Sequence, residues 1–167
     1  MSEPTPLHPQ TQVVQQGRPE REPGGAIIGG IAVSTTYRAG GEYIYGRSDN
    51  DTWKDLEAVL GALEEGSALV FSSGMSAISA TFDLIAPGAL IVAPTAGYMN
   101  TFVQLRKLEA NNRLRVRWVD INDTPSVIKA LDGAEMLFFE SPVNPLLTVA
   151  DVQTLINSAK ERGALVA

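Results

Sequence analysis

The stretch ALVFSSGMSAISATFDLIAPGALIVA, residues 68–93, contains the alternation that decides the fold. Its first four residues form a short apolar run, which is typical of a buried strand. Residues 75–85 then carry apolar side chains at the helical spacing, and Pro87-Gly88 ends that helix. Residues 89–93 form a second apolar run. A strand, a helix and another strand in this order predict a βαβ unit with parallel strands.

The same alternation continues on both sides of this segment. Before it, residues 53–63 have apolar side chains at the helical spacing, and Gly66 is the expected end of that helix. After it, we expect helices at 98–109, 127–131 and 152–159, and strands at 114–118, 135–139 and 164–167. The pattern predicts an α/β fold with a mostly parallel sheet. Because the last run stops before the loop that normally follows such a strand, we expect the domain to be truncated.

Composition and charge narrow the classes of function. The chain has 13 Lys and Arg against 19 Asp and Glu, with a net charge of -6. We therefore expect neither nucleic acid nor an anionic membrane surface as a partner, because both attract clustered cations. With no cysteine and one histidine, His8, the sequence excludes thiol nucleophiles and Cys-ligated zinc, and we expect no metal site. The N-terminal residues lack the apolar core of a signal peptide, so a cytoplasmic location is expected.

The N-terminal residues 1–25 are expected to form an extended arm, because prolines interrupt any continuous helix there. These prolines are Pro4, Pro6, Pro9, Pro19 and Pro23. The arm is either a disordered tail or a segment that clasps a partner subunit. We expect the arm and the clasping segment to extend over residues 1–50, and the larger domain to occupy residues 51–167.

A serine- and glycine-containing turn is the first candidate binding element. Ser72-Ser73-Gly74-Met75 lies between a predicted strand and a predicted helix. A helix N-terminus offers free N–H donors and a partial positive charge, so this turn could hold a phosphate. It is neither a Walker loop nor a dinucleotide-binding fingerprint. An ordinary turn with a serine N-cap is the alternative interpretation.

Two further elements offer polar groups to a ligand. Tyr45 and Arg47 lie two residues apart, so an extended segment directs both side chains to one side, where they suit a phosphate dianion. The sequence Glu140-Ser141-Pro142-Val143-Asn144-Pro145 follows a predicted strand, at the sheet edge where α/β proteins bind ligands. Asn144 can present its amide there. A surface Tyr–Arg pair and a simple turn are the alternatives.

Taken together, these elements resemble the Cys/Met-metabolism family of pyridoxal 5′-phosphate (PLP) enzymes. The elements, in chain order, are Tyr45-x-Arg47, Ser73-Gly74-Met75, Tyr98 and Glu140-Ser141-Pro142-x-Asn144-Pro145. The family includes the transsulfuration enzymes cystathionine gamma-synthase, cystathionine gamma-lyase and methionine gamma-lyase, and the homoserine sulfhydrylases. The resemblance extends from about Thr11 to Ala167. It implies a three-layer α/β large domain of the aspartate-aminotransferase type, with the extended arm before it.

The resemblance implies a role for each candidate residue. Ser73, Gly74 and Met75 would bind the PLP phosphate, the last two through backbone N–H groups. Tyr45 and Arg47 would reach the phosphate of a neighbouring subunit's cofactor. This role implies a homo-oligomer, a dimer of dimers at full length, with a small amino acid as substrate.

The ring of the cofactor has its own implied partners. Tyr98 would stack on the pyridine ring and lie near the reacting substrate, which makes it the candidate catalytic residue. Asn144 would hydrogen-bond the 3′ oxygen of the cofactor.

The sequence also departs from the family pattern. Met99 and Asn100 replace the two glycines of the family's Tyr-Gly-Gly-Thr, which is expected to reshape the pocket. Asp51 replaces the proline of Asn-Pro-Thr, which is expected to leave that loop less rigid. The family's aspartate for the pyridine nitrogen and its Schiff-base lysine have no counterpart. The lysines present, all expected on solvated helix faces, are Lys54, Lys107, Lys129 and Lys160.

The resemblance therefore implies the N-terminal portion of a PLP-dependent transsulfuration enzyme. Such an enzyme acts on sulfur amino acids or activated homoserine by γ-elimination or γ-replacement. Without the lysine, this chain is expected to be inactive alone. Two alternatives stay open: a non-catalytic module that pairs with a full-length paralogue, and an unrelated nucleotide-binding α/β domain.

Overall fold

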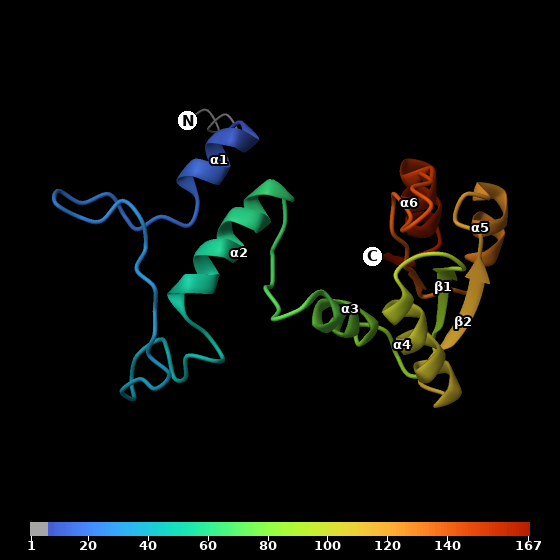
Figure 1. The fold of residues 1–167 in the computed structure, drawn as a ribbon, viewed down its shortest axis with the longest axis horizontal. Coiled ribbons are helices and arrows are strands. Elements are labelled where there is room, and N and C mark those ends of the chain that lie inside the picture. Colours follow the sequence, from blue (N-terminus) through green and yellow to red (C-terminus); the bar gives the residue numbers. More distant parts are fainter. Residues whose placement is uncertain (1–6) are drawn as a thin grey trace. The chain divides into compact units, whose positions relative to one another are not determined.

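The structure, a computed structural model, describes residues 7–167 and has two compact units. The first unit extends to Ser72, and the second comprises Ser73–Ala167. Figure 1 shows the chain of both units, coloured along the sequence. The two units therefore divide after Ser72. The division expected at residue 50 separates a subunit-clasping segment from the larger domain, and it stays a prediction. No helix within residues 7–167 is long and apolar enough to cross a membrane.

The first unit contains two helices, α1 (Pro9–Gln15) and α2 (Asp51–Leu63), which pack against each other. The expectation of an extended arm is wrong over α1. Pro9 occupies the start of this helix, where a missing N–H costs nothing, and Pro19 lies beyond its end. From residue 16 to residue 50 the chain is irregular, apart from an isolated bridge between Thr36 and Tyr45.

The end of α2 differs in one detail from the prediction. Gly66 does close the helix, because its N–H donates to the carbonyl of Gly61 at 2.9 Å. The left-handed residue, however, is Glu65, with φ of 52°, where helices usually place glycine.

The strand predicted at residues 68–71 is wrong. These residues are irregular, and Leu69 is 77% exposed. The Val70 N–H donates to the Glu57 carboxylate at 2.8 Å instead of to a neighbouring strand. An apolar run becomes a strand only where another strand pairs with it, and none does so within the described residues.

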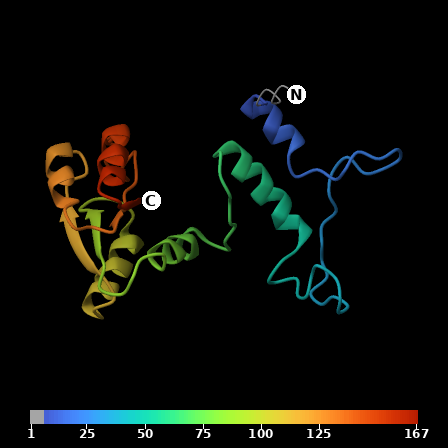
Figure 2. The ribbon, with the colours of Figure 1, turned by 180° about the vertical axis from the view of Figure 1, so that it is seen from behind.

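The second unit is a parallel sheet with helices on both faces. Its strands lie in the order β2-β1-β3-β4, and every pair is parallel. The strands are β1 (Leu90–Pro94), β2 (Arg115–Val119), β3 (Met136–Leu137) and β4 (Leu165–Val166). The helices are α3 (Gly74–Phe82), α4 (Met99–Ala110), α5 (Thr124–Ala130) and α6 (Val152–Glu161). Figure 2 shows the same unit from behind.

Alternate side chains of β1 belong to two separate cores. Leu90 and Val92 pack in a core that includes residues of α5 and α6. Ile91 and Ala93 pack in another, with Phe82 of α3 and Leu105 of α4. Because successive strand residues point to opposite faces, these cores lie on the two sides of the sheet. The three-layer α/β fold is therefore confirmed for this unit.

Asp123 is the N-cap of α5. Its carboxylate accepts hydrogen bonds from the Ser126 N–H at 3.2 Å and the Ser126 hydroxyl at 2.6 Å. These bonds hold the pKa of Asp123 below its ordinary value. A carboxylate whose pKa is lower in the folded than in the unfolded state stabilises the fold at any pH above its unfolded-state pKa, which is about 4 for Asp. This stabilisation is lost as the pH falls through the folded-state pKa.

The cap makes a prediction about pH. Asp123→Ala should lower the melting temperature at pH 7, and its difference from the wild type should shrink below about pH 4, where the wild-type carboxyl becomes protonated. Thermal unfolding over a pH series measures this. Asp132→Ala, which removes an exposed carboxylate that caps no helix, is the control. A difference that grows on acidification would contradict the assignment.

Candidate cofactor site

A cavity of about 500 Å³ lies in the second unit at the carboxyl ends of β1 and β3. From β1 the chain continues to β2 on one side, whereas β3 and β4 lie on the other. Open α/β sheets bind ligands at such a change of direction. The lining residues are Ser73, Gly74, Met75, Ile78, Pro94, Gly97, Tyr98, Thr101, Phe102, Phe138 and Glu140.

The N-terminus of α3 supplies hydrogen-bond donors to this cavity. Ser73 caps the helix, and its hydroxyl oxygen accepts from the Ser76 N–H at 3.1 Å. The N–H groups of Gly74 and Met75 have no hydrogen-bond partner among residues 7–167. The space beside the Gly74 Cα is also open, with no atom within 4 Å of a Cβ placed there. The site therefore offers two free donors and the positive end of a helix dipole to an anion.

Tyr98 lies at the start of α4 and is 42% exposed at the cavity. Its phenol oxygen accepts a hydrogen bond from the Asn100 side-chain amide at 2.9 Å. The sequence predicted only that Asn100 would reshape the pocket. In the structure, this replacement for a family glycine orients the hydroxyl of the candidate catalytic residue.

Asn144 is the one candidate of the second unit that does not line this cavity. Its side chain is exposed in a turn that is closed by its own backbone hydrogen bonds. In one of them, the Val143 N–H donates to the carbonyl of Thr148 at 2.9 Å. The Ser141 hydroxyl accepts from the Ala150 N–H at 3.1 Å and closes the turn. The contact between Asn144 and the cofactor stays a prediction.

Tyr45 and Arg47 lie in the first unit. The extended segment expected there is wrong, because residues 45–48 form a turn in which the Ser48 N–H donates to the carbonyl of Tyr45 at 2.9 Å. The Arg47 guanidinium is 5.1 Å from the centre of the Tyr45 ring. Gly46 between them is buried, and its N–H donates to the carbonyl of Thr35 at 2.8 Å. A Cβ at Gly46 would collide with the carbonyl oxygen of Ser34. This position therefore requires glycine.

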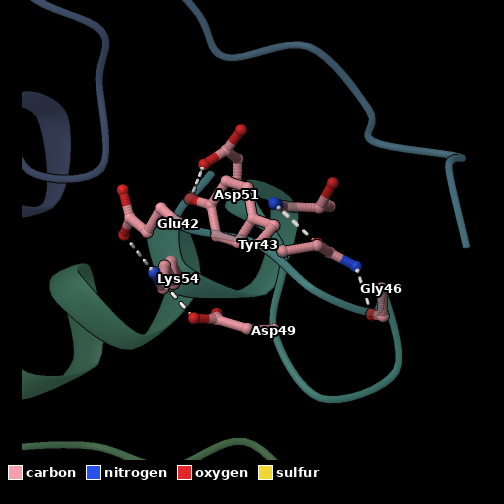
Figure 3. A network of polar contacts seen from close by, with 8 residues as sticks. Glu42, Tyr43, Gly46, Asp49, Asp51 and Lys54 are labelled. Carbon is pink, nitrogen blue, oxygen red and sulfur yellow. Dashed lines mark hydrogen bonds and ion pairs between the residues drawn. The ribbon is translucent and has the colours of Figure 1, made fainter. Parts of the chain in front are cut away.

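A polar network holds this segment to α2 (Figure 3). Lys54 bridges Glu42 at 2.9 Å and Asp49 at 2.8 Å. The hydrogen bonds to Asp49 and Glu42 raise the pKa of Lys54. The Tyr43 hydroxyl donates to Asp51, and this bond raises the pKa of Tyr43.

Asn50 and Asp51 anchor the loop at the start of α2. The Asn50 amide donates to the carbonyl of Gly46 at 3.2 Å, and its oxygen accepts from the Thr52 N–H at 2.9 Å. Asp51 replaces the family proline, and the sequence suggested a less rigid loop. Its carboxylate forms a side-chain link to Tyr43 that a proline could not form. The structure thus ties this loop to Tyr43 through the Asp51 side chain, and the lower rigidity stays a prediction.

Comparison with known proteins decides the family. Residues 10–167 match the model of the family described as Cys/Met metabolism PLP-dependent enzyme. The chain belongs to this family. A putative cystathionine gamma-lyase of Streptomyces coelicolor is 36% identical, over 94% of this chain and 42% of the relative.

Solved structures of similar proteins support the same family assignment. A methionine gamma lyase from Micromonospora echinospora has a TM-score of 0.84 at 36% identity, covering 96% of this chain and 44% of that one. A cystathionine gamma synthase from Xanthomonas oryzae pv. oryzae, in complex with cystathionine, has a TM-score of 0.88 at 29% identity, covering 97% and 44%. The chain thus spans less than half the length of these relatives.

The cavity fits the PLP on which this family depends. Its volume lies within the range of small-molecule sites. The free N–H groups of Gly74 and Met75 suit the phosphate, and Tyr98 and Phe102 offer aromatic surface to the pyridine ring. An anion site beside aromatic walls matches the two parts of this cofactor.

Proposed function

We propose that the chain is the N-terminal portion of the PLP-binding domain of a transsulfuration enzyme. The enzyme acts on sulfur amino acids or activated homoserine by γ-elimination or γ-replacement. The observation that supports this is the cavity at the sheet's change of direction, where two free backbone donors lie beside Tyr98. When bound, PLP supplies an electron sink that stabilises a carbanion at the substrate's α-carbon.

The residues of this chain bind the cofactor, orient it and exclude water from the cavity. The Gly74 and Met75 N–H groups and the Ser73 hydroxyl bind the phosphate. Tyr98 places its ring against the cofactor, and the Asn100 amide holds its hydroxyl at the side where substrate reacts. Phe138 adds an apolar wall that excludes water.

Three predicted residues complete the proposal outside this cavity. Tyr45 and Arg47 lie in the segment whose neighbouring residues Glu42, Tyr43 and Asp49 contact α2. They bind the phosphate of a neighbouring subunit's cofactor in a homo-oligomer. Asn144 bonds the 3′ oxygen of the cofactor. The full-length assembly is a dimer of dimers.

The chain alone is proposed to bind PLP without turnover. No lysine is among the described residues that line the cavity. Lys54 is engaged with Glu42 and Asp49 in the first unit. The family's lysine, which carries protons between substrate atoms, therefore has no substitute in the described cavity.

The test is an assay of cystathionine cleavage by the purified 167-residue chain with PLP. We expect 2-oxo acid release at the buffer rate. Adding a polypeptide that comprises the part of the Streptomyces coelicolor relative beyond the matched region should restore release, because it supplies the lysine. Turnover by the chain alone would refute the proposed inactivity. Failure of the chain to bind PLP would refute the cofactor site itself.

A second candidate is a non-catalytic module that pairs with a full-length paralogue. It is favoured by the exposed apolar residues of the first unit, because such residues are usually buried against a partner. They are Ile27, Ile28, Ile31 and Val33, between 72% and 87% exposed. Co-purification with a larger paralogue, lost on Ile31→Asp, would favour this candidate over an isolated half-enzyme.

A further inference from the structure

A groove of about 830 Å³ lies beside α5 and shares no lining residue with the cofactor cavity. β2 and the end of α6 contribute to its walls, and α5 and α6 lie side by side (Figure 1). The charged residues that line it are Arg117, Lys129, Asp132 and Arg162. Three cations and one carboxylate thus meet in a chain whose net charge is -6. The proposed function gives this groove no role.

Helix ends fix both arginines of the groove. The Nη1 atom of Arg117 donates to the carbonyl of Ala130, the last residue of α5, and to the carbonyl of Asp132 at 3.0 Å. The Nη1 atom of Arg162 donates to the carbonyl of Ser158, in the last turn of α6, at 2.8 Å. Carbonyls at the end of a helix lack partners within it, so each guanidinium satisfies such a group and is held in place by it.

The other edge of each guanidinium is free. A guanidinium carries five N–H donors in a planar fork, and its Nε and Nη2 atoms can bind one carboxylate or phosphate through two parallel hydrogen bonds. Within residues 7–167, these two atoms have no hydrogen-bond or ion-pair partner in Arg117 or in Arg162. The Lys129 ammonium has none there either, and Asp132 forms an ion pair with none of the three cations.

The groove therefore offers two anchored arginine edges and an ammonium group to an anion. Because carbonyl bonds already fix the arginines, they lose little side-chain entropy when an anion binds. Each edge suits one oxyanion group, so two edges favour a ligand that carries two such groups. We propose that the groove binds a small molecule with two or more oxyanion groups, either carboxylates or phosphates. This site is separate from the cofactor cavity, and the inference does not rest on the proposed function.

The arginine Nε–H signals in the NMR spectrum of the full chain test this site. Titration with tricarballylate, which has three carboxylates, or with pyrophosphate should shift the Nε–H signals of Arg117 and Arg162 until they saturate. The Nε–H of Arg115 already donates to the carbonyl of Gly88 at 2.9 Å, so its signal should stay unchanged. Propionate, with one carboxylate, should give no saturating shift over the same concentrations. Saturation by only one of the two polyvalent probes would support the inference and identify the oxyanion as carboxylate or phosphate.

Matched variants show whether the charges of the groove hold the probe. Lys129→Met should weaken tricarballylate binding roughly 3-fold or more, whereas Asp132→Asn should strengthen it, because it removes the one carboxylate. Lys160→Met makes the same charge change at an exposed residue of α6 that does not line the groove, and should leave the affinity unchanged. Lys129→Met should melt like the wild type, because its ammonium forms no ion pair within residues 7–167.

Two results would overturn the inference. One is the absence of saturating shifts at Arg117 and Arg162 with both polyvalent probes. The other is equal affinity of the wild type, Lys129→Met and Asp132→Asn for tricarballylate, which would mean that the charges of the groove do not hold it. Shifts confined to the backbone amides of Gly74 and Met75 would place the probes in the cofactor cavity alone, so the groove site would fail while the cofactor site stands.

Discussion

Replacing Gly74 with proline should weaken PLP binding about 10–100-fold while leaving α3 folded. Proline has no N–H, so the substitution removes one of the two free donors at the cavity. A hydrogen bond to a charged group contributes about 1.5–3 kcal/mol, which corresponds to this loss of affinity. Equilibrium dialysis of PLP against the purified chain measures it.

The helix should tolerate this change because Gly74 is its first residue. Proline is favoured at that position, where the missing N–H has no partner within the helix. Ser73 before it has φ of -158° and ψ of 155°, an extended conformation that a following proline permits. No atom lies within 4 Å of a Cβ at residue 74. Circular dichroism should therefore show unchanged helix content.

Gly74→Ala is the matched control, since it adds a Cβ at the same position but keeps the N–H. We expect it to bind PLP more tightly than the proline variant by at least several-fold. Equal binding by wild type and Gly74→Pro would mean that this N–H does not hold the phosphate. Equal losses in both variants would indicate a steric effect rather than a lost donor.

Leu105→Ala should lower the free energy of unfolding by about 2–5 kcal/mol, because it leaves a cavity in a packed core. Leu105 is fully buried and packs with Phe82 and Ile91 beneath α4. Tyr98 immediately precedes this helix, so the variant should also weaken PLP binding. Urea unfolding followed by circular dichroism measures the change in stability.

Val103 on the same helix provides the control. Its side chain is 58% exposed, so Val103→Ala should change the free energy of unfolding by no more than about 0.5 kcal/mol. Similar losses for the two variants would mean that α4 does not pack through Leu105. A loss below about 1 kcal/mol for Leu105→Ala would contradict the described core.

Much of the second unit could be predicted because its signals are local. Residues 89–93 form a continuous apolar run, and β1 lies at Leu90–Pro94 with both faces covered. The predictions failed where a partner or a position decides the conformation. Residues 68–71 resemble a strand but no described strand pairs with them. The prolines of residues 1–25 predict no continuous helix there, yet Pro9 starts α1.

Some residues of the candidate site could also be predicted from local sequence, whereas others depend on contacts that form only in the folded chain. Ser73 and Gly74 were predictable, because an N-cap and a helix start are properties of adjacent residues. Glu140 lies within a recognised motif, but only the folded chain brings Gly97 beside it. The bond from Asn100 to Tyr98 likewise requires the first turn of α4 to be formed. Such contacts leave no periodic signal in a sequence.

The most direct test of the cofactor site is the amide NMR spectrum of the chain during titration with pyridoxine 5′-phosphate. The account predicts that the Gly74 and Met75 amide resonances shift and saturate, while Gly133, which lies away from the cavity lining, stays unchanged. Saturating shifts elsewhere, with Gly74 and Met75 unaffected, would contradict the claim that the N-terminus of α3 holds the phosphate.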